Sequence, residues 1–298
     1  MLILALASIC LNTCQISLHL PNLFSRQSPV GHGHLDLGMI RDNKSGQALS
    51  AQQLAERLAV ASRVLVGEQH DNPDHHALEL WLMQVLAARR PQGSLLLEML
   101  NPDQQARVTA IQSDLAQEKY PSDLPVALNW QKAWDWSLYG PLMRYVLAQP
   151  YPVMSANLDT NEIMPTYRQA AESSGSLSAA PAVRERLLAL IRDSHGVLPE
   201  DRLPALLAVQ QQRDQRMAQS LLAAPLPSVL FAGAWHVRKD VGVPLHLADL
   251  GVTQPAVVLL LVRMGEEVEP QSADYVWYTA ATPEKDSGAQ LRQSPPEA

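Results

Sequence analysis

Cysteine is almost missing from this 298-residue sequence. The two cysteines, Cys10 and Cys14, both lie in the apolar segment at the N-terminus. Everything after that segment therefore lacks a thiol, which excludes a cysteine-based zinc site, a cysteine nucleophile and an internal disulfide there.

Clustered positive charge is also missing. The formal net charge is −7, and the lysines and arginines form no basic stripe. Phosphate recognition requires such clusters, so we expect no nucleic-acid partner. The sequence contains no GxSxG, HEXXH, P-loop or GxGxxG motif, so no motif supports serine hydrolysis or nucleotide binding.

The N-terminal segment has the apolar character of an export signal. Residues 2–9 are apolar, but no lysine or arginine precedes them, and residues 11–14 (LNTC) loosely resemble a lipoprotein cleavage box. We interpret residues 1–20 as a signal or lipoprotein segment with an N-terminal lipid anchor, and residues 21–34 as a linker. The alternative is a disordered or packed extension. No later apolar run is long enough to span a bilayer.

The remaining chain alternates strands with helices. Short apolar runs at 64–66, 94–97, 151–156, 228–231 and 256–262 predict buried strands, and helical periodicity covers 50–61, 73–89 and 204–223. This order predicts an α/β domain over residues 35–280, with a mostly parallel central sheet flanked by helices. We also expect edge strands at 35–40 and 275–278 and a short helix at 129–136.

One block departs from this alternation. Residues 161–224 show helical periodicity alone and are divided by prolines and glycines. We interpret this block as a smaller helical subdomain inserted before the last strands. The polar, proline-ended residues 281–298 are expected to form a disordered tail.

The densest polar motif is RVLVGEQHDNPDHH at residues 63–76. A buried strand ends at Gly67, and Glu68 and His70 follow it directly. Asn72-Pro73 then provides an N-cap and a first helical proline, which places two further histidines in the first helical turn. A strand that ends in ionisable groups and leads into a helix is typical of ligand sites in α/β sheets.

Other strands also end in polar residues. Glu98 follows the second buried strand, Asn157 the third, His236 the fourth and Arg263 the last apolar strand. Parallel strands end at one sheet edge, so we expect these side chains to converge. The proposed functional set is Glu68, His70, Glu98 and His236. Such a set suits a divalent metal, or general acid–base chemistry without a metal.

Two neighbouring pairs have simpler interpretations. His75 and Glu79 are one turn apart, so they can pair with each other on the helix. Arg213 and Asp214 can form a salt bridge on the long helix, or they can reach over the sheet edge and close a pocket there.

Six segments occur in an order that resembles a known family. They are VLVGEQHDNPDHH, LLLEM, WDWSLYGPL, SANLD, RDQRMA and FAGAWH. Together they resemble the ChaN family of iron-regulated haem-binding lipoproteins, within the wider group that includes Tiki proteins and erythromycin esterases. The resemblance spans residues 64–262, and its glutamate–histidine segment is the most specific part.

The resemblance implies a haem-binding protein rather than an enzyme. It implies a location in the bacterial cell envelope, as a periplasmic protein or outer-membrane lipoprotein that assists haem or iron uptake or storage. The implied partners are a second copy of the chain and the components of a haem-uptake receptor or transporter.

In the family, haem lies at a dimer interface, with a tyrosine on the iron and a histidine of the partner subunit nearby. Tyr167 is our first candidate for the iron ligand, because inserted subdomains commonly form such interfaces. Tyr139 and Tyr151 are alternatives. The candidate histidines at the haem are His70, His76 and His236.

Two other functions remain open at this point. The related Tiki proteins and erythromycin esterases suggest a metal-dependent hydrolase, in which Glu68 or Glu98 would act as the base on a water that a metal or a histidine activates. The other alternative is an envelope scaffold whose polar cluster no longer has a function.

Overall fold

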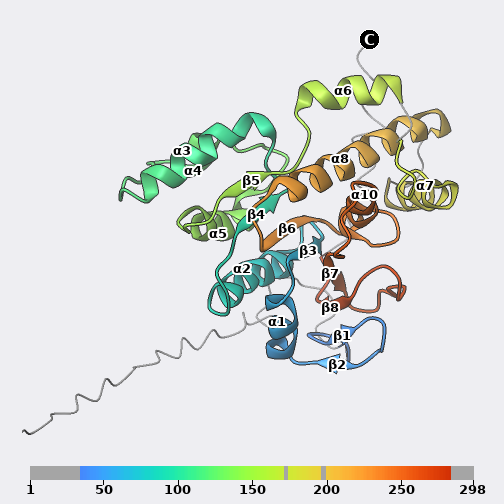
Figure 1. Ribbon diagram of the computed structural model, residues 1–298, viewed down its shortest axis with the longest axis horizontal. Coiled ribbons are helices and arrows are strands. Elements are labelled where there is room, and N and C mark those ends of the chain that lie inside the picture. Colours follow the sequence, from blue (N-terminus) through green and yellow to red (C-terminus); the bar gives the residue numbers. More distant parts are fainter. Residues whose placement is uncertain (1–33, 171–173, 196–198, 283–298) are drawn as a thin grey trace, which may run out of the picture.

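The computed structural model describes residues 34–170, 174–195 and 199–282 (Figure 1). The expected signal segment and nearly all of the expected linker and tail lie outside these residues. No described helix combines the length and the apolar character that crossing a membrane requires.

Eight strands form one sheet in the order β2-β1-β8-β7-β3-β6-β4-β5. The strands from β3 to β8 pair in parallel, while β1 is antiparallel to both of its neighbours, β2 and β8. The expected mostly parallel sheet is therefore confirmed. The strands are β1 Ile40–Asp42, β2 Ala48–Leu49, β3 Arg63–Glu68, β4 Ser94–Leu97, β5 Val153–Ser155, β6 Ser228–Gly233, β7 Val257–Arg263 and β8 Tyr275–Thr279.

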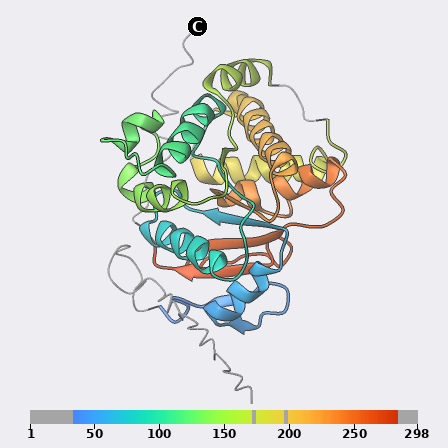
Figure 2. The same ribbon diagram turned by 60° about the vertical axis from the view of Figure 1, so that its left-hand side comes forward.

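Helices cover both faces of this sheet (Figures 1 and 2). Alternate side chains of β3 point to opposite faces, so Val64 and Val66 join one apolar core and Leu65 joins the other. The first core includes α1, α2, α3 and α5, and the second includes α8 and α10. The helices are α1 Ala51–Ala59, α2 Pro73–Ala87, α3 Gln105–Leu115, α4 Leu124–Leu128, α5 Trp136–Leu147, α6 Thr160–Gln169, α7 Pro181–His195, α8 Leu203–Ala223, α9 Ala234–Val237 and α10 Val243–Asp249, with short 3-10 turns at Pro102–Gln104 and Glu200–Arg202.

The turn between β3 and α2 is fixed by Asn72. Its side-chain oxygen accepts a hydrogen bond from the Asp74 backbone N–H at 3.0 Å and so caps α2 as the sequence predicts. Its amide also donates to the backbone oxygen of Ala280 at 2.9 Å. This one buried side chain therefore ties the start of α2 to the end of β8.

Two predicted elements differ from the structure. The strand expected at 35–40 begins only at Ile40, because the chain before it turns with Gly38 at φ +80°. No helix covers residues 129–136: α4 ends at Leu128, and Asn129 adopts the left-handed conformation that terminates it. Asp135 then caps a separate helix, α5.

Between β5 and β6 the described chain is helical. The helices α7 and α8 share a small apolar core of their own, and α6 lies alongside α8 (Figure 1). None of the residues of α6 is buried. Arg216 of α8 pairs with Glu162 of α6, which fixes one helix on the other.

The edge strand β5 is covered by two glutamines of α3. Gln105 accepts from the Ser155 N–H at 2.7 Å and donates to the Val153 oxygen at 3.0 Å. Gln112 accepts from the Val153 N–H at 3.1 Å and donates to the Tyr151 oxygen at 2.9 Å. Each amide takes the place of a neighbouring strand, and this edge is therefore closed to further strand pairing.

We predict that Gln112→Ala destabilises the protein by about 1–2 kcal/mol, because two backbone groups of the edge lose their partners. Urea denaturation measures the change. Gln117→Ala is the matched control, since the Gln117 side chain bonds to its sequence neighbours Ser113 and Lys119 and not to the edge strand. Equal stability of the two variants would contradict the role assigned to Gln112.

Candidate functional site

The polar residues that follow the parallel strands lie at one edge of the sheet. Glu68 ends β3, Glu98 follows β4 and His236 lies in α9, directly after β6. β4 and β3 both pair with β6, so these three residues lie at the ends of adjacent strands. The structure therefore brings Glu68, Glu98 and His236 to the same sheet edge, as the sequence predicts.

The Glu68 carboxylate contacts three side chains of the site. Its Oε1 accepts a hydrogen bond from the Tyr139 hydroxyl at 2.7 Å and lies 2.9 Å from Nδ1 of His70. Its Oε2 lies 3.3 Å from Nδ1 of His76. Glu68, His76 and Tyr139 are buried, whereas the His70 side chain is 37% exposed.

Glu98 and His236 form a second group at the same edge. Glu98 Oε1 lies 3.4 Å from Nε2 of His236, and Nδ1 of that ring contacts the buried Asp214 of α8. Glu98 Oε2 accepts from the backbone N–H of Gly233 at 2.8 Å and lies 3.8 Å from Nε2 of His70. His70 therefore stands between the two carboxylates.

Gly233 fits this site because it has no side chain. A first side-chain carbon at this position would lie 2.9 Å from Nε2 of His70, closer than packed atoms approach. The glycine thus allows His70 to occupy its place above the strand ends.

Each of the two groups contains a histidine and carboxylates of opposite charge in a buried environment. Burial alone would lower the pKa of His236, but Glu98 and Asp214 raise that pKa to about 10. Burial also opposes the charge of His76, yet Glu68 and Glu79 raise its pKa to about 9. At neutral pH both imidazoles are therefore cations paired with carboxylates.

The four residues of the predicted set form a chain of contacts and do not surround one point. The group of histidine and carboxylate atoms that does converge, among the described residues, is Glu68, His76 and Glu79. Asn157 supports the edge by donating to the Glu98 backbone oxygen at 2.9 Å. Arg263 pairs with Glu266 beyond the end of β7.

One of the two simpler pairings differs from expectation, and the other follows one of its two alternatives. Glu79 pairs with His76 and not with His75. Nδ1 of His75 accepts from the Gln69 backbone N–H at 2.8 Å, and its Nε2 lies 2.8 Å from the Thr279 hydroxyl. Asp214 does reach the sheet edge, where it contacts His236.

Sequence reasoning does not predict the contacts that two aromatic residues make in this cluster: Tyr139 is expected only as an alternative haem ligand, and Trp134 is not expected there. The Tyr139 hydroxyl contacts both Glu68 and His70, and the Trp134 ring meets the His70 ring edge-on at a centroid distance of 4.8 Å. The clustering of tryptophans at 130–136 was the available signal. It indicates an aromatic wall, but it does not indicate which residue the wall contacts.

The fold and the site together define an α/β protein with a glutamate–histidine cluster at the carboxyl edge of its parallel strands. The family described as haem-binding uptake, Tiki superfamily, ChaN matches residues 54–247. The chain therefore belongs to the ChaN family.

A solved structure of another ChaN protein agrees with this assignment. ChaN of Campylobacter jejuni, in a structure that shows cofacial haem binding, is 28% identical, with a TM-score of 0.75, over 82% of this chain and 97% of that chain. An erythromycin esterase variant in its open conformation is 13% identical, with a TM-score of 0.43, over 85% of each chain. No curated protein matches the sequence.

We predict that Tyr139→Phe lowers stability by about 1.5–3 kcal/mol, since a buried carboxylate oxygen loses its hydroxyl donor. Denaturant unfolding checks this value. Tyr145→Phe on the same helix is the control, because Tyr145 lies outside the cluster. A loss no larger than that of the control would contradict the role of Tyr139.

The buried His75 predicts a pH effect. Burial lowers its pKa to about 3, so below pH 6.5 the unfolded chain takes up a proton that the folded chain does not. The contribution of neutral His75 to stability is therefore fully present above pH 6.5 and is lost as the pH falls toward 3. We expect the wild type to lose about 1 kcal/mol more than His75→Gln between pH 7 and 5.5. Parallel pH profiles of urea unfolding would contradict this prediction.

Proposed function

We propose that this protein binds haem in the bacterial cell envelope and assists haem or iron uptake or storage. Membership of the ChaN family supports haem as the ligand. The same membership favours haem binding over the metal-dependent hydrolase. The anchor that would hold the protein at a membrane belongs to residues 1–20, outside the described part of the chain.

Accessibility is the observation that supports Tyr167 as the proposed iron ligand. Tyr139 is buried and its hydroxyl is hydrogen-bonded to Glu68, and Tyr151 is also buried. Tyr167 is half-buried on α6, a helix without any buried side chain. Of the three candidates it alone reaches solvent, where a phenolate can meet the iron of a haem carried between proteins. Tyrosine is an established haem ligand, and a phenolate oxygen favours Fe(III).

The neighbours of Tyr167 on α6 suit the other parts of a haem. Met164 and Arg168 are one turn apart, and Tyr167 lies on the same side of the helix. The Met164 side chain is 38% exposed and offers apolar contact to a porphyrin face. Arg168 is exposed and offers a cation to a propionate.

Among the three candidate histidines, His70 is the accessible one. His76 and His236 are buried, and both ring nitrogens of each contact protein oxygens. His70 therefore fits best the role of the histidine near the haem. We propose that α6 forms part of a homodimer interface, so that this histidine comes from the partner subunit. The further partners would be components of a haem-uptake receptor or transporter.

We predict that Tyr167→Phe abolishes the phenolate-to-iron charge-transfer band when purified, tag-free protein is titrated with ferric haem. The phenyl ring keeps the packing but has no oxygen for the iron. Absorbance spectra and the Soret shift at each haem concentration measure the effect.

Tyr120→Phe is the matched control, because Tyr120 is a strongly exposed tyrosine outside α6. The control is expected to titrate as the wild type does. A charge-transfer band that persists in Tyr167→Phe would remove this residue as the ligand. A wild-type protein that shows no saturable Soret shift would overturn the haem proposal as a whole.

A further inference from the structure

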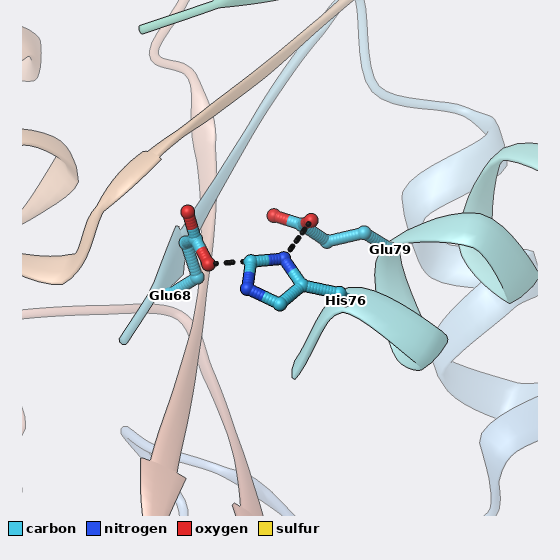
Figure 3. Close-up of side chains that lie close together, drawn as sticks. All are labelled: Glu68, His76 and Glu79. Atoms are coloured by element: carbon cyan, nitrogen blue, oxygen red, sulfur yellow. Dashed lines mark hydrogen bonds and ion pairs between the residues drawn. The ribbon is translucent and has the colours of Figure 1, made fainter. Parts of the chain in front are cut away.

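Beneath the exposed sheet edge, three ionisable side chains point toward one another (Figure 3). Glu68 comes from the end of β3, and His76 and Glu79 come from the first two turns of α2. The carboxylate side chains are fully buried, and the histidine side chain is 3% exposed. The haem proposal makes no use of Glu79.

The spacing between His76 and each carboxylate is close to that of ligands around one ion. Nδ1 of His76 lies 3.3 Å from Oε2 of Glu68 and 3.2 Å from Oε2 of Glu79. A tetrahedral ion with bonds of about 2.0–2.2 Å holds its ligand atoms about 3.3–3.6 Å apart. One donor atom from each residue lies within 4.8 Å of the other two.

Neighbouring groups orient both Glu68 and His76. The Nε2–H of His76 donates to the backbone oxygen of His70 at 3.0 Å, so Nδ1 is the nitrogen that faces the carboxylates. The Tyr139 hydroxyl donates to Oε1 of Glu68, and Oε2 is the oxygen turned toward the histidine. Hydrogen bonds to the far side of histidine and carboxylate ligands are the usual support of a metal site.

Two carboxylate oxygens here lack a hydrogen bond. Among the described residues, neither Oε2 of Glu68 nor Oε1 of Glu79 has a hydrogen-bond partner, although both atoms are buried. Burying a carboxylate oxygen without a donor is costly. A cation between Glu68 and Glu79 would give Oε2 of Glu68 a partner and would balance the charge of both carboxylates.

We propose that Glu68, His76 and Glu79 bind one divalent transition-metal ion. The ion would displace the Nδ1 proton of His76 to solvent, because a metal ligand must be deprotonated. The resulting neutral imidazole and the two carboxylates suit zinc, manganese or ferrous iron, and they leave a site of zero net charge when occupied. Three converging protein ligands leave the fourth position of a tetrahedral ion to water. The ion would tie the end of the central strand to α2 and would be held by the haem-free protein.

This site differs from the one expected from the sequence. The expected set, Glu68, His70, Glu98 and His236, shares only Glu68 with it. Glu79→Gln and Glu98→Gln therefore separate the two sites, because each variant removes one carboxylate from one set and keeps nearly the same shape.

We predict that the tag-free, haem-free full chain, stripped with a chelator and loaded with Zn²⁺, retains about one zinc per chain through a desalting column, by elemental analysis. Glu79→Gln should retain almost none, since it removes one of three protein ligands. Glu98→Gln should retain as much as the wild type. Circular dichroism confirms that each variant is folded.

Co²⁺ loading of the wild type provides a second measurement that needs no variant. Tetrahedral coordination by one nitrogen and oxygens is expected to give visible d–d absorption, which excess Zn²⁺ abolishes. A wild type that retains no zinc and shows no cobalt absorption would overturn the proposal, because the three residues would then form a proton-bound ion cluster. Zinc loss in Glu98→Gln but not in Glu79→Gln would also overturn it, in favour of the other set.

Discussion

The buried carboxylate of Glu68 is the constraint on which the rest of this site depends. It lies at the end of the central strand with 2% of its surface exposed. A buried charge is tolerated only when it is paired and hydrogen-bonded. His70, His76 and the Tyr139 hydroxyl supply those contacts from the turn after β3, from α2 and from α5. One carboxylate therefore links the central strand to two helices on the same face of the sheet.

The molecule carries two separate sets of functional groups. The sheet edge holds the glutamate–histidine cluster, in which only His70, beside Trp134, is substantially exposed. The helix α6 lies alongside α8 and presents Tyr167 from a helix that buries nothing. The proposed haem binding by α6 and the proposed metal binding beneath the sheet edge therefore use different side chains, and the failure of one proposal leaves the other intact.

The sequence predicts the sheet edge well, because parallel strands end on the same side and their polar last residues can be read directly. The sequence does not predict the contacts that depend on how a helix is rotated about its own axis. His75 faces Thr279 and His76 faces Glu68, and two adjacent histidines give no pattern that distinguishes these directions. Tyr139 is 71 residues from Glu68, so its role follows only from the packing of α5 on α2.

Backbone hydrogen exchange of the haem-free and haem-loaded protein tests the central claim most directly, because it locates the haem without any substitution. We predict that haem slows exchange over α6, residues 160–169, and around His70, and leaves residues 73–79 unchanged, since His76 and Glu79 are already buried. Protection confined to residues 63–79, with α6 unaffected, would contradict haem binding at α6 and would move the haem to the sheet edge.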